Sequence, residues 1–218
     1  MPASAEMVDV GAMAQVQSTV YGTAPQASQA VKRLGDSVVF QEEVETIAGS
    51  AALIRFVDDS TLALGAKSKV VIDEFVFDPS KAEGNALVRI SVGTLRYITG
   101  DMPKGKTVIK TPTATLVLRG TDVTVHVHPD GTTDTRVNEG VVDAHNDVTN
   151  GDTEIGAGTG ATLGHDGNSE FNGDNGPIGP GPGGDPSDPP EHRRGGQPNS
   201  TGGGSSGSSS SGGYGRTN

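Results

Sequence analysis

The sequence contains no cysteine and no tryptophan, and aromatic residues make up only 4% of its 218 residues. Without cysteine, the chain cannot form a disulfide scaffold, a thiol nucleophile or a thiolate-ligated metal site. The scarcity of aromatic residues argues against a polysaccharide-binding face, because proteins usually hold sugar rings against aromatic side chains. Hydrophobic residues make up 32%. This fraction is too low for the whole chain to be packed, since apolar burial must offset the entropy lost on ordering.

Cationic side chains and long apolar runs are also scarce. The sequence has 16 Lys and Arg residues and 27 Asp and Glu residues, which gives a formal net charge of −11. We therefore expect neither nucleic acid nor an anionic membrane surface as a partner, because binding to either requires positive charge on the protein. No stretch approaches the roughly 20 apolar residues of a membrane-spanning helix. Residues 7–20, where a secretory signal would place its apolar core, are interrupted by Asp9, Gln15 and Gln17, so we expect no signal peptide in the sequence.

Composition divides the chain into four parts. Residues 1–30 are rich in Ala, Gln, Ser and Thr; we expect a weakly ordered N-terminal arm, with a short helix around residues 7–17 as one option. Residues 31–146 are dense in β-branched residues and should form the folded domain. Residues 147–171 form a polar extension rich in Gly and Asp. Residues 172–218 hold 15 of the 33 glycines and 7 of the 13 prolines, which predicts a disordered Gly/Ser/Pro-rich tail.

The pattern of residues in the middle of the chain predicts short β-strands. Apolar residues alternate with polar ones in the run 87–92 and again in 123–128, and further extended runs occur at 53–57, 70–77, 108–109 and 114–118. Alternation with a period of two is the pattern of a strand with one buried face. No amphipathic helix of ten residues or more interrupts residues 31–146. The sequence therefore predicts an all-β fold.

Turn residues separate these strands. The strongest signal is Asp130-Gly131, because an Asp-Gly pair between alternating runs suits a tight hairpin. Gly84-Asn85, Gly93 and Gly100 are read as further turns. A compact β-sandwich and a short β-solenoid fit this pattern equally well, and both stay open at this point.

The order of several motifs resembles that of a FecR-type domain. The resemblance begins with residues 34–38 and 43–46, continues through the Asp-Asp-Ser-Thr-Leu run at 58–62, and includes residues 72–79 and 93–100. Its most specific part is residues 110–115, followed by Leu-Arg-Gly-Thr-Asp at 118–122. Together these motifs span about residues 31–146, slightly more than half of the chain.

The residues that carry the resemblance predict structural roles. Thr111-Pro112 favours an extended entry into the next strand, and Gly120 can adopt dihedral angles that other residues avoid. We expect Arg119 to bond exposed carbonyls or a carboxylate such as Asp122, because its guanidinium has several donors in a fork. The structural signature expected from the sequence comprises Asp59, Ser60, Gly65, Thr111, Pro112, Arg119, Gly120 and Thr121.

The candidates for metal binding are incomplete. His126 and His128 lie two residues apart on an expected strand, so both should project from its solvent face about 7 Å apart, opposite Val123, Val125 and Val127. A zinc site requires three or four ligands, and no third ligand is apparent. The Gly- and Asp-rich stretches at 150–167 and 172–176 weakly resemble calcium-binding repeats but do not keep a period. We expect no metal and no other cofactor.

The candidates for catalysis are equally weak. The acidic pairs Glu42-Glu43, Asp58-Asp59 and Asp73-Glu74 lie at turns or strand ends, where carboxylates commonly accept backbone hydrogen bonds. Ser60 and Ser68 lack the Gly-x-Ser-x-Gly context of an activated nucleophile. The expectation is a protein that is not an enzyme.

The resemblance implies an envelope protein and leaves two functions open. The best-known FecR proteins are iron-transport regulators with a sigma-binding helical segment, a membrane helix and a mixed α/β signalling module, none of which this sequence shows. We therefore expect a stand-alone, non-catalytic interaction or structural module that is periplasmic or extracellular and binds a protein partner. The alternative is a signalling adaptor that relays the state of a transporter or receptor. Open strand edges would also allow self-association.

Overall fold

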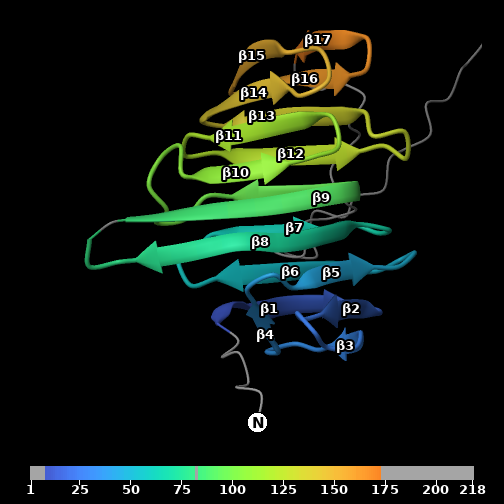
Figure 1. Cartoon of the computed structure of the whole chain (residues 1–218), viewed down its shortest axis with the longest axis vertical. Helices are drawn as coiled ribbons and strands as arrows, with labels where there is room; N and C mark the ends of the chain where they lie inside the picture. The colour runs from blue at the N-terminus through green and yellow to red at the C-terminus, as the bar shows by residue number, and fades with distance from the viewer. Residues whose placement is uncertain (1–7, 82, 173–218) are drawn as a thin grey trace, which may run out of the picture.

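The computed structural model describes residues 8–81 and 83–172, and all helix or strand assignments in these ranges are strands (Figure 1). In chain order the strands are β1 (Asp9–Gln17), β2 (Val20–Thr23), β3 (Ala30–Lys32), β4 (Ser37–Val39), β5 (Glu43–Thr46), β6 (Ala51–Phe56), β7 (Thr61–Leu64), β8 (Lys69–Asp78), β9 (Glu83–Ile98), β10 (Thr107–Lys110), β11 (Ala114–Leu118), β12 (Asp122–Val127), β13 (Thr133–Glu139), β14 (Val141–Asn146), β15 (Gly151–Gly156), β16 (Thr159–Gly164) and β17 (Gly167–Asn172). The expected all-β fold class is confirmed.

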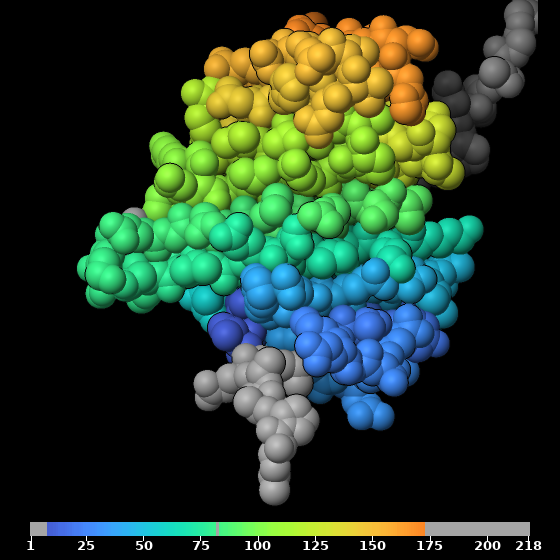
Figure 2. Space-filling view, viewed as in Figure 1, coloured from blue at the N-terminus to red at the C-terminus, as the bar shows by residue number. Residues whose placement is uncertain are grey.

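The strands form two sheets that share β9. Sheet A has the order β4-β1-β6-β7-β9-β12-β13-β16-β17. Sheet B has the order β3-β2-β5-β8-β9-β10-β11-β14-β15. Neighbouring strands are antiparallel except for β9 and β10, which run parallel. Both sheets therefore advance along the chain from one end of the molecule to the other, as the colour bands of Figures 1 and 2 show.

The two sheets face each other across one hydrophobic core. The rings of Phe56 in sheet A and Phe75 in sheet B stack with centroids 4.7 Å apart, and the fully buried Tyr97 lies beside Phe56 at 6.2 Å. Val, Ile and Leu side chains from both sheets complete the cluster. The fold is thus a sandwich, and its strands are added in nearly sequential order as in a solenoid, which explains why the sequence pattern allowed both.

Strand β9 passes from one sheet to the other at Gly93. Its first half pairs with β8 and β10 in sheet B, and the part from Gly93 onward pairs with β7 and β12 in sheet A. Gly93 has φ +99°, and a Cβ at this position would lie 2.5 Å from the Cα of Ser68. The expectation of turns at Gly84-Asn85 and Gly93 is therefore wrong, because glycine here permits a crossing strand and a close backbone approach.

Two regions outside the expected domain also form strands. Residues 9–17 and 20–23, assigned from sequence to a weakly ordered arm or a short helix, form β1 and β2. Register shifts in the pairing of β1 with β4 and β6 break the alternation of buried residues, so the strand had no readable period. Beyond residue 146, β15 pairs with β14 and β16 pairs with β13, so the Gly- and Asp-rich extension continues both sheets.

The expected Asp130-Gly131 hairpin is confirmed. Gly131 has φ +90°, its amide donates to the carbonyl of His128, and the turn joins β12 to β13. The expected tail, 172–218, lies outside the described residues except for Asn172, the last residue of β17. Within the described ranges, no helix has the length and apolar character needed to cross a membrane.

Candidate functional site

The Asp-Asp-Ser motif after β6 forms a buried hydrogen-bond cluster. Asp58 is 1% exposed, and its Oδ1 accepts bonds from the amide and the hydroxyl of Ser60 at 3.0 and 2.6 Å. The Tyr97 hydroxyl in turn donates to the Oγ of Ser60 at 2.9 Å, and burial raises the pKa of Tyr97. Asp59 points outward with φ 61° and pairs with Arg55 at 3.1 Å. Ser60 and Asp58 therefore hold the β6–β7 turn against the core.

Gly65 takes part in a second buried cluster between the sheets. Its amide donates to the carbonyl of Thr94 at 2.9 Å, and its carbonyl accepts from the hydroxyl of Thr46 at 2.5 Å. The Thr46 hydroxyl also accepts from the amide of Ser68 at 2.9 Å. These bonds fasten the β7–β8 connection to β5 and to the crossing point of β9.

The Thr-Pro-Thr motif joins three parts of the fold. The Thr111 hydroxyl accepts from the amide of Ala114 at 2.8 Å, which closes the turn before β11. The Thr133 hydroxyl donates to the Oγ of Thr111 at 2.7 Å, and the Thr113 hydroxyl lies 2.9 Å from that of Thr133. Pro112 lies under the β12–β13 turn, since its Cβ is 3.2 Å from the position of a Cβ at Gly131. The motif packs the two sheets together at this end.

Arg119 binds two carboxylates on neighbouring strands. Its Nη2 donates to Oδ1 of Asp143 on β14 at 2.7 Å and to Oε2 of Glu154 on β15 at 2.5 Å. The suggested partner, Asp122, is wrong, because it accepts a two-pronged bond from Arg96 at 2.9 and 2.8 Å. The choice of partners depends on strand register, which places β14 beside β11.

The residues after Arg119 form a close turn contact. Gly120 has φ +68°, and a Cβ at Gly140 would lie 2.0 Å from the carbonyl oxygen of Gly120. The Thr121 amide donates to the hydroxyl of Thr99 at 3.1 Å. The residues of the expected signature therefore make contacts within the fold, several of them through the backbone, and their assignment as structural residues stays a prediction to be tested by mutation.

The two histidines of β12 lie together on the outer face of sheet A. Their rings meet edge to face with centroids 4.5 Å apart. His126 Nδ1 lies 2.7 Å from the hydroxyl of Thr94, and His128 Nε2 lies 2.7 Å from Oδ2 of the buried Asp134. Burial and then the neighbouring His128 lower the pKa of His126. The histidines are half-buried and bonded, rather than the separate solvated side chains expected from the sequence.

The acidic candidates make contacts that suit structural roles. Glu42 is buried, pairs with Lys32 at 2.6 Å and accepts the amide of Val39 at 3.0 Å. Asp73 pairs with Arg89. Among residues 8–81 and 83–172, no three His, Asp or Glu side chains are grouped so as to hold a metal ion.

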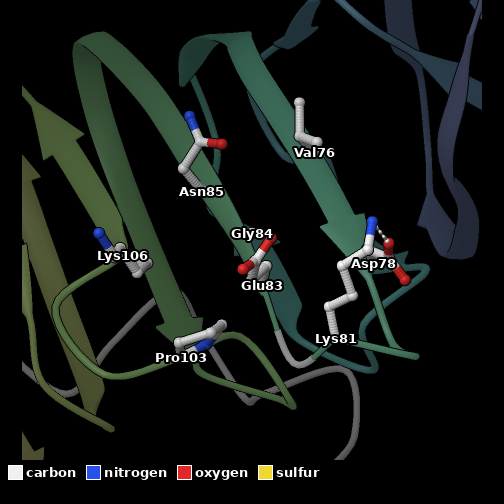
Figure 3. A pocket seen from close by; sticks show the side chains of 8 residues that line it. All are labelled: Val76, Asp78, Lys81, Glu83, Gly84, Asn85, Pro103 and Lys106. Atoms are coloured by element: carbon white, nitrogen blue, oxygen red, sulfur yellow. Dashed lines mark ion pairs between the residues drawn. The ribbon is translucent and has the colours of Figure 1, made fainter.

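An open cleft lies beside the hairpin formed by β8 and β9. The cleft has a volume of about 780 Å³, and its lining comprises Val76, Asp78, Lys81, Glu83, Gly84, Asn85, Pro103 and Lys106 (Figure 3). The hairpin supplies one side, and the loop before β10 supplies Pro103 and Lys106. Lys81 pairs with Asp78 at 2.8 Å and, with Ser80, lowers the pKa of Asp78.

The hairpin itself projects from the sandwich, to the left in Figures 1 and 2. In the part of the chain that the structure describes, residues 76–78 of β8 and 83–85 of β9 pair as strands only with one another. Val76 on this hairpin is 57% exposed. This feature was not predictable from the sequence, because the run 70–77 predicts a strand but gives no sign that the strand extends beyond its neighbours.

A second hollow, of about 470 Å³, lies on the outer face of sheet B beside the partners of Arg119. His145 in its lining lies 2.7 Å from Asp152, and Asp143 and Glu154 hold Arg119. Its charged groups are thus already engaged with one another, which makes the hairpin cleft the better candidate for recognition.

Comparison with known proteins finds a family match for the middle of the chain. A family model described as FecR protein matches residues 42–143. Comparison with curated proteins finds no match. Two crystal structures of a candidate anti-sigma factor from Parabacteroides distasonis are similar in fold, one with a TM-score of 0.50 at 16% identity and one with 0.49 at 14%. Each alignment covers 60% of this chain and 59% of the other.

The family match includes all eight signature residues identified from sequence, from Asp59 to Thr121. The structural similarity supports the fold alone, and the chain spans less than two thirds of the proteins it resembles. Residues 42–143 therefore match the FecR family, which confirms for this part of the chain the resemblance expected from the sequence.

Proposed function

We propose that this chain is a non-catalytic protein-binding module of the bacterial cell envelope, with the β8–β9 hairpin and its cleft as the recognition surface. The observation that carries the proposal is a difference between buried, hydrogen-bonded motif residues and exposed residues of the hairpin. The motif residues Ser60 and Thr111 make buried side-chain hydrogen bonds inside the sandwich, whereas the hairpin exposes Val76 and unpaired strand edges. Exposed edges and apolar side chains are features through which β proteins bind extended partner segments.

A signalling adaptor is the second candidate, and the family match favours it. The similar crystal structures are described as those of a candidate anti-sigma factor, a protein class that acts by binding another protein. A regulatory adaptor and a structural module would use the same kind of surface, so the structure of the surface alone does not separate them. An envelope location is the expectation that both candidates share.

Site-specific photo-crosslinking in the native bacterium tests the binding proposal. A photoreactive residue at Val76 should give one crosslinked protein in the envelope fraction. The control position is Val148, which is 44% exposed and follows β14 rather than lying on the hairpin. Equal labelling of many proteins from both positions, or no product from Val76, would contradict the assignment of the hairpin.

Transcript profiling separates the two candidates. If the chain is a signalling adaptor, deleting its gene should change the expression of genes under one alternative sigma factor, and the Val76 crosslink should identify a transporter, a receptor or a sigma regulator. A structural module predicts an unchanged transcript profile and a crosslink to a surface or cell-wall protein. Self-association through the open edges of β15 and β17 stays a prediction, which light scattering of the full chain would test.

A further inference from the structure

Strand β10 presents two lysines on the outer face of sheet B. Thr107 is 1% exposed and Ile109 is fully buried, so the alternate residues Val108 and Lys110 point outward. Lys106, one residue before the strand, is exposed in the lining of the hairpin cleft (Figure 3). Within residues 8–81 and 83–172, neither lysine side chain makes a hydrogen bond or an ion pair. The outer side of β10 therefore carries Lys, Val and Lys in alternation.

An aliphatic stripe crosses β10 between these lysines. Strand register places Leu87 of β9 and Val117 of β11 on either side of Val108. All three side chains are partly buried and face outward. The stripe spans two strand spacings, about 10 Å, and each lysine lies about 7 Å from its centre along the strand. The surface is thus a short apolar stripe with one cation on each side.

The other charged groups beside the stripe are already paired. On β9, Arg89 bonds Asp73. Beyond β11, Asp143 and Glu154 hold Arg119. In a chain with a formal net charge of −11, two unpaired ammonium groups beside this stripe favour an anionic partner at this place, because complementary charge sets the register and the choice of partner.

The stripe favours a peptide over a simple polyanion. A phosphate chain or an acidic polysaccharide could bind the two lysines but would leave the aliphatic side chains uncovered. A segment with an apolar side chain between two carboxylates contacts both parts of the surface, and the apolar area that it removes from water adds to the affinity.

We propose that the outer face of β10 binds an acidic amphipathic segment of the protein that the hairpin recognises. An apolar side chain of this segment lies on the aliphatic stripe, and its carboxylates pair with Lys106 and Lys110. The inference rests on the proposed function and adds the chemistry of the partner. Because Lys106 also lines the hairpin cleft, the segment runs from the cleft onto sheet B.

Photo-crosslinking at Val108 in the native bacterium tests the inference, with Val76 as the reference position. Both positions should capture the same protein, and peptide sequencing should place the Val108 crosslink in a segment with an apolar residue between Asp or Glu residues. A Val76 product without a Val108 product, or a Val108 crosslink to a segment without acidic residues, overturns the inference while the hairpin assignment stands. No product at either position overturns the proposed function and this inference with it.

Charge reversal in the full chain gives a second readout, with a synthetic copy of the crosslinked segment as the probe. Lys110→Glu should weaken binding at least about tenfold, because like charges then face each other. The matched control is Lys67→Glu, which makes the same change of charge on the exposed turn between β7 and β8 and should change the affinity by less than about twofold. Both variants should keep the wild-type melting temperature, and equal affinities of the two folded variants for the probe overturn the inference.

Discussion

Asp58 and Asp59 are adjacent in the chain but lie in opposite environments. Asp58 is 1% exposed and accepts two bonds from Ser60, whereas the side chain of Asp59 is 69% exposed. Removing the Asp58 carboxylate leaves the buried amide and hydroxyl of Ser60 without their acceptor. Removing the charge of Asp59 affects only an exposed ion pair, a type of contact that contributes little to stability.

We therefore predict that Asp58→Ala lowers the free energy of unfolding by about 2–3 kcal/mol. Tyr97→Phe removes a single hydrogen bond and should cost about 1 kcal/mol. Asp59→Asn is the control and should change stability by less than about 0.5 kcal/mol. Urea denaturation of the three variants measures these values, and equal effects at positions 58 and 59 would contradict the assigned roles.

His126 makes stability depend on pH. Burial and the neighbouring His128 lower its pKa from 6.5, while Asp134 acts in the opposite direction. Because the unfolded chain then binds more protons than the folded chain below pH 6.5, acidification destabilises the fold. The stability contributed by neutral His126 is complete above pH 6.5 and is lost as the pH falls toward the lowered pKa.

We predict that the melting temperature falls between about pH 7 and pH 5 and that His126→Gln makes this fall shallower. His165→Gln serves as the control, since His165 is exposed on the turn between β16 and β17. Thermal melts of the three proteins at half-unit pH steps provide the test. Parallel curves for His126→Gln and wild type would rule out this histidine as the source.

At the scale of the element, β9 decides the architecture. It is the strand on which both sheets depend, and its crossing requires the positive φ of Gly93 and the close approach of the Ser68 backbone. Alanine at this position would be strained in its dihedral angles and would also clash with backbone atoms.

Gly93→Ala should therefore destabilise the fold by about 3 kcal/mol, the upper end of the cost of backbone strain. Gly156→Ala is the matched control, because a Cβ there meets nothing within 4 Å. Chemical denaturation of both variants checks the prediction, and a mild effect at Gly93 similar to that at Gly156 would show that the crossing tolerates a side chain.

The strands that were predictable are those with an unbroken alternation. The pattern of 123–128 places Val123, Val125 and Val127 in the core, and the structure buries all three completely. Strand β1 was not predictable, because register shifts in its pairing interrupt the alternation of buried and exposed residues along the strand. Likewise, the long β9 was divided in the sequence analysis because glycine marks both turns and close backbone contacts.

The candidate site was predictable only in part, because its contacts are long-range. The sequence indicated which residues form the signature, including Arg119 and Thr111, since they stand in recognisable local motifs. It did not indicate that Arg119 would reach Asp143 and Glu154, which are 24 and 35 residues away. The projecting hairpin was not predictable either, because it results from the lengths of neighbouring strands rather than from any single residue.

At the scale of the whole molecule, the residues that hold the fold lie apart from those that we propose to bind a partner. Arg119 joins β11 to β14 and β15 through exposed ion pairs, so Arg119→Ala should reduce stability by no more than about 1 kcal/mol and leave the binding surface intact. Val76 on the hairpin contributes little to the core because it is 57% exposed. A charge at Val76 should therefore disturb binding without unfolding the protein.

The decisive measurement is the affinity of the crosslinked partner for these two variants. We predict that Val76→Glu keeps the wild-type melting temperature but weakens binding at least about tenfold, the effect of about 1.4 kcal/mol. Arg119→Ala should bind the partner with wild-type affinity. Retained binding by Val76→Glu would exclude Val76 of the hairpin from the recognition surface, and lost binding by a stably folded Arg119→Ala would place that surface at the signature motif.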